Sequence, residues 1–178
     1  MSRSTDWTPS LWVDSFNELL YDDNKLDYDD KWTLNFNYSQ THTLTKNERR
    51  KGWKVYCHYT TGHFRCDSCS RTWGSARVVV LFRYRLLKER GTVIMRPFGQ
   101  ACRSCDDNMY DLPGFSKKEV KQALLRLFAK IRKNCYNEED EYDDDDGLSA
   151  RSTKVWTKPH EETLCEACSL DICCQDDE

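Results

Sequence analysis

Residues 66–105 have the sequence CDSCSRTWGSARVVVLFRYRLLKERGTVIMRPFGQACRSC, in which a Cys-x-x-Cys pair stands at each end of a long segment rich in β-branched and aromatic residues. From Val78 to Leu86, apolar residues at every second position define one face of a strand, and arginines share the other face. The residues KERG supply a turn, where Gly91 is free to take a positive φ, and residues 92–98 return as a second strand. The segment therefore predicts a β-hairpin that brings the two cysteine pairs together.

Two thiolates separated by two residues can bind one zinc ion, and two such pairs complete a tetrahedral site without an open position. A redox-active pair is expected between a strand and a helix in a βαβ pattern, which this sequence lacks. The first residues, MSRSTDWTPS, do not contain the apolar core of a secretory signal, so disulfides are not expected either. We therefore predict one structural zinc bound by Cys66, Cys69, Cys102 and Cys105.

A third Cys-x-x-Cys pair, Cys165 and Cys168, lies near the end of the chain and needs two further ligands to bind a second zinc. The available side chains are Cys135, His160, Cys173 and Cys174. We predict a second site of Cys135, His160, Cys165 and Cys168, with Cys173 as the alternative ligand. The spacing leaves open another arrangement, in which the third pair joins one of the first two.

Charge and composition divide the chain into three parts. Residues 138–178 carry 15 acidic and 3 basic side chains, whereas residues 1–137 carry 24 basic and 15 acidic ones. The run EEDEYDDDDG from Glu138 has too few apolar residues to fold by itself. We expect a main zinc-binding body at 1–137, an acidic flexible linker at 138–150, and a Cys-rich tail at 151–178 that belongs to the same zinc domain. The longest apolar run, Val78 to Phe82, is far shorter than the ~20 residues that cross a bilayer.

Helices and a further strand are expected around the hairpin. Thr8 and Pro9 open an amphipathic helix, and residues 32–38 alternate as a strand does. Ser116 and Glu119 form a capping box at the start of a strongly amphipathic helix that runs to about residue 134. Cys57 lies in a strand-like stretch and is expected to be a buried free thiol. The predicted fold class is α+β: a zinc-ribbon-like antiparallel β-sheet with flanking helices and a Cys-rich tail docked by the second zinc.

Two sets of basic side chains are candidates for partner binding. One is an exposed stripe on the polar face of the hairpin, and the other is the basic surface of the long helix. The alternative interpretation of the second set is the solvent-exposed side of an ordinary amphipathic helix. The candidate residues are Arg83, Arg85, Arg96, Lys121, Arg126 and Lys130. The sequence shows no Ser-His-Asp arrangement, phosphate-binding loop or paired carboxylates, so an enzyme is not expected.

Several motifs together resemble one known family. They are DKWTLNF, RRKGW, FRCDSCSRTWGSARVVVLF, MRPFGQACRSC, a capped helix ending in NCY, and PHEETLCEAC. Their order and surroundings are similar to those of the receptor-transporting proteins, whose domain contains three Cys-x-x-Cys pairs. The resemblance implies a zinc-binding, chaperone-like accessory protein that promotes cell-surface expression of G-protein-coupled receptors of the odorant, taste or opioid type.

The same resemblance implies an alternative function and a cellular location. Some relatives are interferon-induced antiviral effectors with RNA binding attributed to them, so RNA is the alternative partner, with Trp53 or Tyr59 as stacking residues. The implied location is the cytoplasm, at the cytosolic face of the endoplasmic reticulum or plasma membrane. Family members typically continue into a C-terminal hydrophobic anchor, whereas this sequence ends at CCQDDE.

Overall fold

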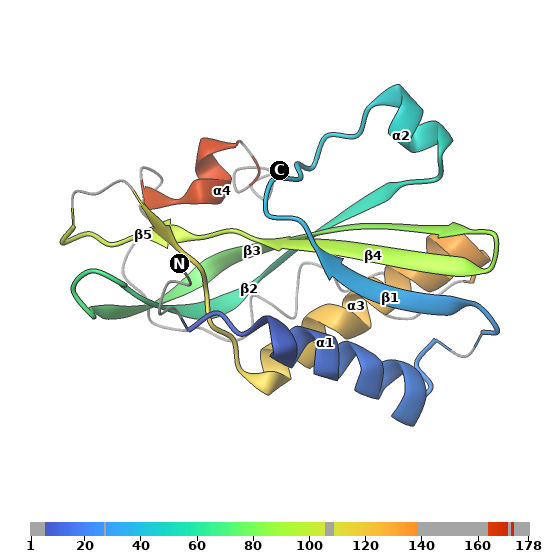
Figure 1. The fold of residues 1–178 in the computed structure, drawn as a ribbon, viewed down its shortest axis with the longest axis horizontal. Coiled ribbons are helices and arrows are strands. Elements are labelled where there is room, and N and C mark those ends of the chain that lie inside the picture. Colours follow the sequence, from blue (N-terminus) through green and yellow to red (C-terminus); the bar gives the residue numbers. More distant parts are fainter. Residues whose placement is uncertain (1–5, 27, 106–108, 139–163, 171, 173–178) are drawn as a thin grey trace.

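The computed structural model describes residues 6–26, 28–105, 109–138, 164–170 and 172, and its centre is a four-stranded sheet in the order β1-β4-β3-β2 (Figure 1). The strands are β1 (Lys31–Phe36), β2 (Lys54–Arg65), β3 (Thr72–Leu87) and β4 (Arg90–Pro97). β3 pairs antiparallel with β2 and with β4, so the predicted hairpin is confirmed. A small second sheet joins β5 (Gln100–Ala101) to β6 (Tyr110–Asp111).

The sheet is not wholly antiparallel, because β1 runs parallel to β4, with Lys31 opposite Arg90 and Phe36 opposite Met95. After β1 the chain does not turn back beside it. Residues 37–53 instead cross to the far edge of the sheet, where β2 begins, which leaves β1 pointing in the same direction as β4. The predicted strand at 32–38 is confirmed, but its parallel pairing was not foreseen.

The turn between β3 and β4 consists of Lys88 and Glu89, which have φ values of 48° and 67°. Two consecutive positive φ values are typical of the two-residue turns that suit a twisted hairpin. Gly91, which we predicted in that role, belongs to β4 instead. It is required there by packing, because a Cβ at Gly91 would lie 2.0 Å from Cδ2 of Trp32 on the neighbouring strand.

One face of the sheet carries the larger core and is covered by α1 (Pro9–Asn17), its π-helical continuation η1 (Glu18–Asp22) and α3 (Lys117–Tyr136). The predicted capping box of α3 is present: Ser116 accepts a hydrogen bond from the Glu119 amide, and Glu119 accepts one from the Ser116 amide. The most deeply buried side chains of this core, with no more than 1% exposure, include Trp12, Phe16, Phe82, Tyr84, Leu124, Leu127 and Phe128.

The opposite face has a smaller apolar cluster, to which Val79 and Leu81 of β3 contribute together with Phe98. The short helix α4 (Glu166–Ser169) packs there through Ala167, and α2 (Lys46–Arg50) also lies beyond this face (Figure 1). Both faces of β3 are therefore covered over much of their length, as in a buried central strand. No helix in the described part of the chain is long and apolar enough to cross a membrane.

Candidate metal centre

The first two cysteine pairs meet at one end of the sheet. β2 ends at Arg65 and β3 begins at Thr72, so Cys66 and Cys69 lie in the connection between these strands, and the second pair follows β5. The sulfur atoms are 3.6 Å apart between Cys66 and Cys105. They are 3.7 Å apart between Cys69 and Cys102. All four sulfurs lie within 4.8 Å of one another.

This spacing fits a zinc ion. Zinc–thiolate bonds of about 2.3 Å at tetrahedral angles place the sulfurs roughly 3.8 Å apart, close to the distances between the paired cysteines. The connection has the hydrogen bonds of a tight turn, because the Cys66 amide donates to the Arg71 carbonyl and the Ser70 amide donates to the Cys66 carbonyl. A zinc bound by Cys66, Cys69, Cys102 and Cys105 would cross-link β2, β3 and the segment after β5 without an open coordination position.

The thiols strongly influence each other's pKa values. The Arg71 amide, which donates a hydrogen bond to the Cys69 sulfur, lowers the pKa of Cys69. The pKa of Cys105 is raised, chiefly by its hydrogen bond with Cys69 and to a smaller extent by its hydrogen bond with Cys66. Ionisation of one sulfur therefore opposes ionisation of its neighbours, as expected for closely spaced like charges. A divalent cation among the four sulfurs would remove this opposition.

The third pair forms a knuckle of its own. Cys165 is the N-cap of α4, and its sulfur accepts a hydrogen bond from the Cys168 amide at 3.4 Å. Among the described residues, the group of four sulfurs does not include this pair. His160 and Cys173, the other predicted ligands of the second zinc, lie outside the described residues.

Cys135, the fourth residue of that predicted site, is not near the third pair. It lies in the last turn of α3, where it packs against the larger core on one face of the sheet, and burial raises its pKa. Cys165 and Cys168 belong to the cluster on the opposite face. The sheet therefore separates Cys135 from the third pair, and the prediction that they share a zinc is not supported by their placement.

The described part of the tail packs on the body through protein contacts, and its predicted docking by a second zinc stays a prediction. Glu166 exchanges two hydrogen bonds with Gly99: its amide donates to the Gly99 carbonyl, and its carboxylate accepts from the Gly99 amide at 2.9 Å. The same carboxylate lies 3.2 Å from the Arg96 guanidinium. Farther along, the Tyr59 hydroxyl donates to the Ile172 carbonyl at 3.0 Å. Residues 165–170 and 172 thus pack in and against the smaller apolar cluster.

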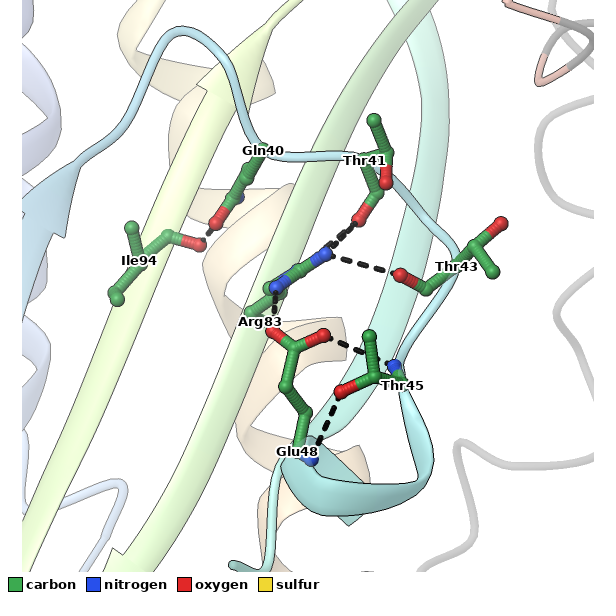
Figure 2. Close-up of polar contacts among 7 residues, drawn as sticks. All are labelled: Gln40, Thr41, Thr43, Thr45, Glu48, Arg83 and Ile94. Atoms are coloured by element: carbon green, nitrogen blue, oxygen red, sulfur yellow. Dashed lines mark hydrogen bonds and ion pairs between the residues drawn. The ribbon is translucent and has the colours of Figure 1, made fainter.

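The predicted exposed arginine stripe is wrong, because residues 37–53 cover that part of the hairpin. Figure 2 shows the Arg83 guanidinium enclosed by this segment. It donates to the Thr41 carbonyl at 2.7 and 3.0 Å and to the Thr43 carbonyl at 3.1 Å, and it forms an ion pair with Glu48. The Arg83 side chain is only 14% exposed.

The other two arginines of the stripe also have internal partners. Arg85 donates to the Lys51 carbonyl at 3.3 Å, and its guanidinium lies 4.4 Å from the centroid of the Trp53 ring. Arg96 is buried, donates to the Gln40 carbonyl at 2.8 Å and pairs with Glu166. These side chains hold the fold together, and a partner does not have access to them as it would to an exposed stripe.

The candidate cations of α3 are half-buried. Lys121 lies 3.1 Å from the Glu18 carboxylate and lowers its pKa, and Lys117 pairs with the other oxygen of Glu18 at 3.4 Å. The ammonium group of Lys130 lies 5.9 Å from the centroid of the Tyr56 ring. Arg126 is likewise half-buried. Part of the basic surface of α3 is therefore neutralised by η1.

Sequence reasoning missed two residues that shape these surfaces. Glu48 closes a capping box with Thr45 and binds Arg83, and the pattern Thr-x-x-Glu at 45–48 was a usable signal for α2. Glu166 anchors the tail, but nothing in the sequence around CEAC indicates its partners Arg96 and Gly99.

A family model described as a zinc-binding domain, the Zn_ribbon_3CxxC model, matches residues 59–171, which contain all three cysteine pairs. The chain is 34% identical to mouse receptor-transporting protein 3 over 83% of this chain and 30% of that protein. It is 31% identical to human receptor-transporting protein 4 over 95% of this chain and 65% of that protein. It is also 34% identical to mouse receptor-transporting protein 2, over 73% of this chain and 58% of that protein.

The chain thus spans between about a third and two thirds of the lengths of these curated relatives. No solved structure matches the chain significantly. The four-sulfur cluster and the family match agree on a zinc-binding domain with at least one zinc ion. The chain belongs to the family of three-CxxC zinc-ribbon domains that includes the receptor-transporting proteins.

Proposed function

We propose that this chain is a zinc-stabilised accessory protein that promotes the movement of G-protein-coupled receptors, of the odorant, taste or opioid type, to the cell surface. The observation that carries the proposal is its similarity to receptor-transporting proteins over 73–95% of its length. The structure supports a binding role, because the four-cysteine cluster would form a closed zinc site that stabilises the sheet. The proposed function is therefore not enzymatic.

The proposed organisation follows the three parts defined by composition. Residues 1–137 form the main body, residues 138–150 a linker, and residues 151–178 a tail that returns to the body through α4. A second zinc in the tail is also proposed. Because the sheet separates Cys135 from the third pair, we assign this zinc to Cys165, Cys168, His160 and the alternative ligand Cys173, which are all close together in sequence.

The proposed location is the cytosolic face of the endoplasmic reticulum or plasma membrane, where the chain would contact cytosolic parts of a receptor. A surface-expression assay tests the proposed function. A receptor that reaches the surface poorly is expressed with an external epitope tag, and surface staining is measured by flow cytometry with the chain, with a version fused to a membrane anchor, and with neither.

The expected result is an increase in surface receptor that requires an intact metal centre. The double substitution Cys66→Ser and Cys102→Ser should abolish the increase, whereas Cys57→Ser, which removes a half-buried thiol outside the cluster, should preserve it. If neither the chain nor its anchored version changes surface staining while total receptor is unchanged, the proposed function is wrong.

The alternative function, RNA binding in an antiviral effector, loses the hairpin part of its proposed binding surface and keeps the exposed lysines of α3, which include Lys118 and Lys133. Arg83, Arg85 and Arg96 have internal partners, and Arg85 occupies one face of the half-buried Trp53 ring. Tyr59 uses its hydroxyl to hold the tail. Stacking on bases requires an accessible aromatic face, so these residues do not provide the expected platform.

A further inference from the structure

One short segment of the second face concentrates accessible positive charge. Lys46, Arg49, Arg50 and Lys51 are all exposed, and none of them makes an ion pair with any residue in the described part of the chain. We call these four residues the α2 basic turn. We propose that the α2 basic turn is a membrane-contact surface, which binds the headgroups of a bilayer that contains anionic phospholipids.

The first observation is that the segment's own acidic residue does not neutralise it. Glu48 is the one carboxylate within residues 46–51, and it pairs with Arg83 beneath the helix while its other interactions close the capping box with Thr45 (Figure 2). These interactions lower the pKa of Glu48, chiefly through the Thr45 amide, so it remains ionised. The negative charge is thus directed inward to Arg83, and all of the exposed charged side chains of α2 are positive.

The second observation is that the turn is firmly held. Arg83 fixes the chain before α2 through the carbonyls of Thr41 and Thr43. Arg85 fixes the chain after α2 through the Lys51 carbonyl and the Trp53 ring. The four cations therefore do not have to be ordered from a free loop when a ligand binds, which lowers the entropic cost of binding. The hairpin arginines are positioning residues for this surface.

The third observation favours a bilayer over a folded protein or RNA. α2 stands out from the sheet in Figure 1, so a flat, charged surface could approach it. None of the exposed large hydrophobic residues lies within residues 44–53, so the turn lacks the aromatic anchors typical of protein interfaces. Trp53 is half-buried and Arg85 occupies one face of its ring, so the turn lacks a fully open stacking platform for bases. The main feature that the turn offers to a partner is its positive charge, which anionic lipid headgroups bind without a specific docking geometry.

The proposal does not depend on receptor transport, and its test uses no receptor. The full zinc-loaded chain is mixed with vesicles of phosphatidylcholine alone or of phosphatidylcholine with about a third phosphatidylserine, and the bound fraction is measured by flotation across a salt series. The test variant replaces all four residues: Lys46→Gln, Arg49→Gln, Arg50→Gln and Lys51→Gln. Near-ultraviolet circular dichroism and zinc content verify that each variant is folded.

A matched control removes the same charge from the opposite face, by Lys25→Gln, Lys117→Gln, Lys118→Gln and Lys133→Gln, all at exposed positions on or beside α3. The chain should bind the phosphatidylserine vesicles and not the neutral ones, and binding should weaken as salt shortens the range of electrostatic attraction. Each Lys or Arg near such a surface contributes roughly a fivefold factor in affinity. If the four contributions multiply, the α2 variant should lose about 600-fold in affinity, and the control much less than that.

Three outcomes would overturn the proposal. The first is an absence of binding to phosphatidylserine vesicles at low salt. The second is a larger loss in the control than in the α2 variant, which would place the membrane surface on α3. The third appears in a parallel titration with single-stranded RNA: if the chain binds the RNA through the α2 basic turn and does not bind vesicles, the turn is a nucleic-acid surface.

Discussion

Arg96 and Glu166 form an ion pair with a nitrogen–oxygen distance of 3.2 Å, although 70 residues separate them in the chain. Arg96 also donates to the Gln40 carbonyl at 2.8 Å. The two segments that cover the second face of the sheet, residues 37–53 and the tail, are therefore both attached to one buried guanidinium.

Replacing Glu166 by Ala should destabilise this arrangement, because it leaves the Arg96 charge buried without its partner. The expected loss is about 2 kcal/mol in the free energy of unfolding, measured by urea denaturation with zinc in excess. Hydrogen exchange at the Gly99 amide, which donates to Glu166, should quicken as well. The exposed residue Glu138 supplies the control: if Glu138→Ala costs as much, the ion pair does not anchor the tail.

Gly91→Ala should displace β1 from the sheet. A Cβ at this position would overlap the Trp32 ring, with three contacts between 2.0 and 2.3 Å, and such overpacking typically costs 1–3 kcal/mol. Tryptophan fluorescence during chemical unfolding measures the loss. Gly74→Ala is the matched control, since its Cβ would approach no atom closer than 4.0 Å, and it should leave stability nearly unchanged. Equal effects of the two substitutions would contradict the packing of Trp32 on Gly91.

Zinc content should separate the cysteines into three groups. Native mass spectrometry of Cys102→Ser should show the loss of one zinc, because this residue contributes to the four-sulfur cluster. Cys165→Ser should remove only the second, tail-bound zinc. Cys135→Ser should retain all bound zinc, since the sheet separates Cys135 from the third pair. Loss of zinc from the Cys135 variant would restore the ligand set predicted from the sequence.

Cys57 should react slowly with iodoacetamide, because burial raises its pKa from 9.0 to about 11 and the thiolate is the nucleophile. At pH 8 its thiolate fraction, and hence its alkylation rate, should be about 100-fold lower than in the urea-unfolded chain. The rate should rise with pH up to about 11, the pKa in the folded state. Peptide mapping of the zinc-loaded protein gives the rate, and equal rates in the folded and unfolded chains would contradict the burial.

The raised pKa also makes Cys57 a source of alkaline destabilisation. The unfolded chain releases this proton near pH 9, whereas the folded chain retains it to about pH 11. The protonated Cys57 thiol therefore contributes fully to the free energy of unfolding below pH 9, and this contribution is lost as the pH rises from 9 to 11. Cys57→Ser should reduce the alkaline loss of stability over this interval.

The hairpin, the capped helix and the first metal centre were predictable because each leaves a local signal. Alternating residues define a strand, Ser116 and Glu119 define a helix start, and the spacing of two Cys-x-x-Cys pairs defines a four-sulfur site. The distance of 3.6 Å between the sulfur atoms of Cys66 and Cys105 agrees with that prediction.

The errors arose where a residue's partner is far away in the chain. Alternation shows that Arg83 faces away from the larger core, but it does not show whether another segment covers that second face. The covering segment is polar, and its contacts with Arg83 come mainly from backbone carbonyls, which any sequence supplies. For Cys135, periodicity indicated a helix that packs on the sheet, but it did not indicate on which face of the sheet the third pair lies.

The parallel pairing of β1 with β4 has a consequence for synthesis on the ribosome. β1 emerges first, but its partner strand consists of residues 90–97, which are translated after both β2 and β3. Until that segment has emerged, Trp32 lacks Gly91 as its packing surface, and pairing across so long a separation in the chain is slow. We therefore expect the β2-β3-β4 unit to form before β1 joins the sheet. The strand that is synthesised first would thus be among the last to be incorporated.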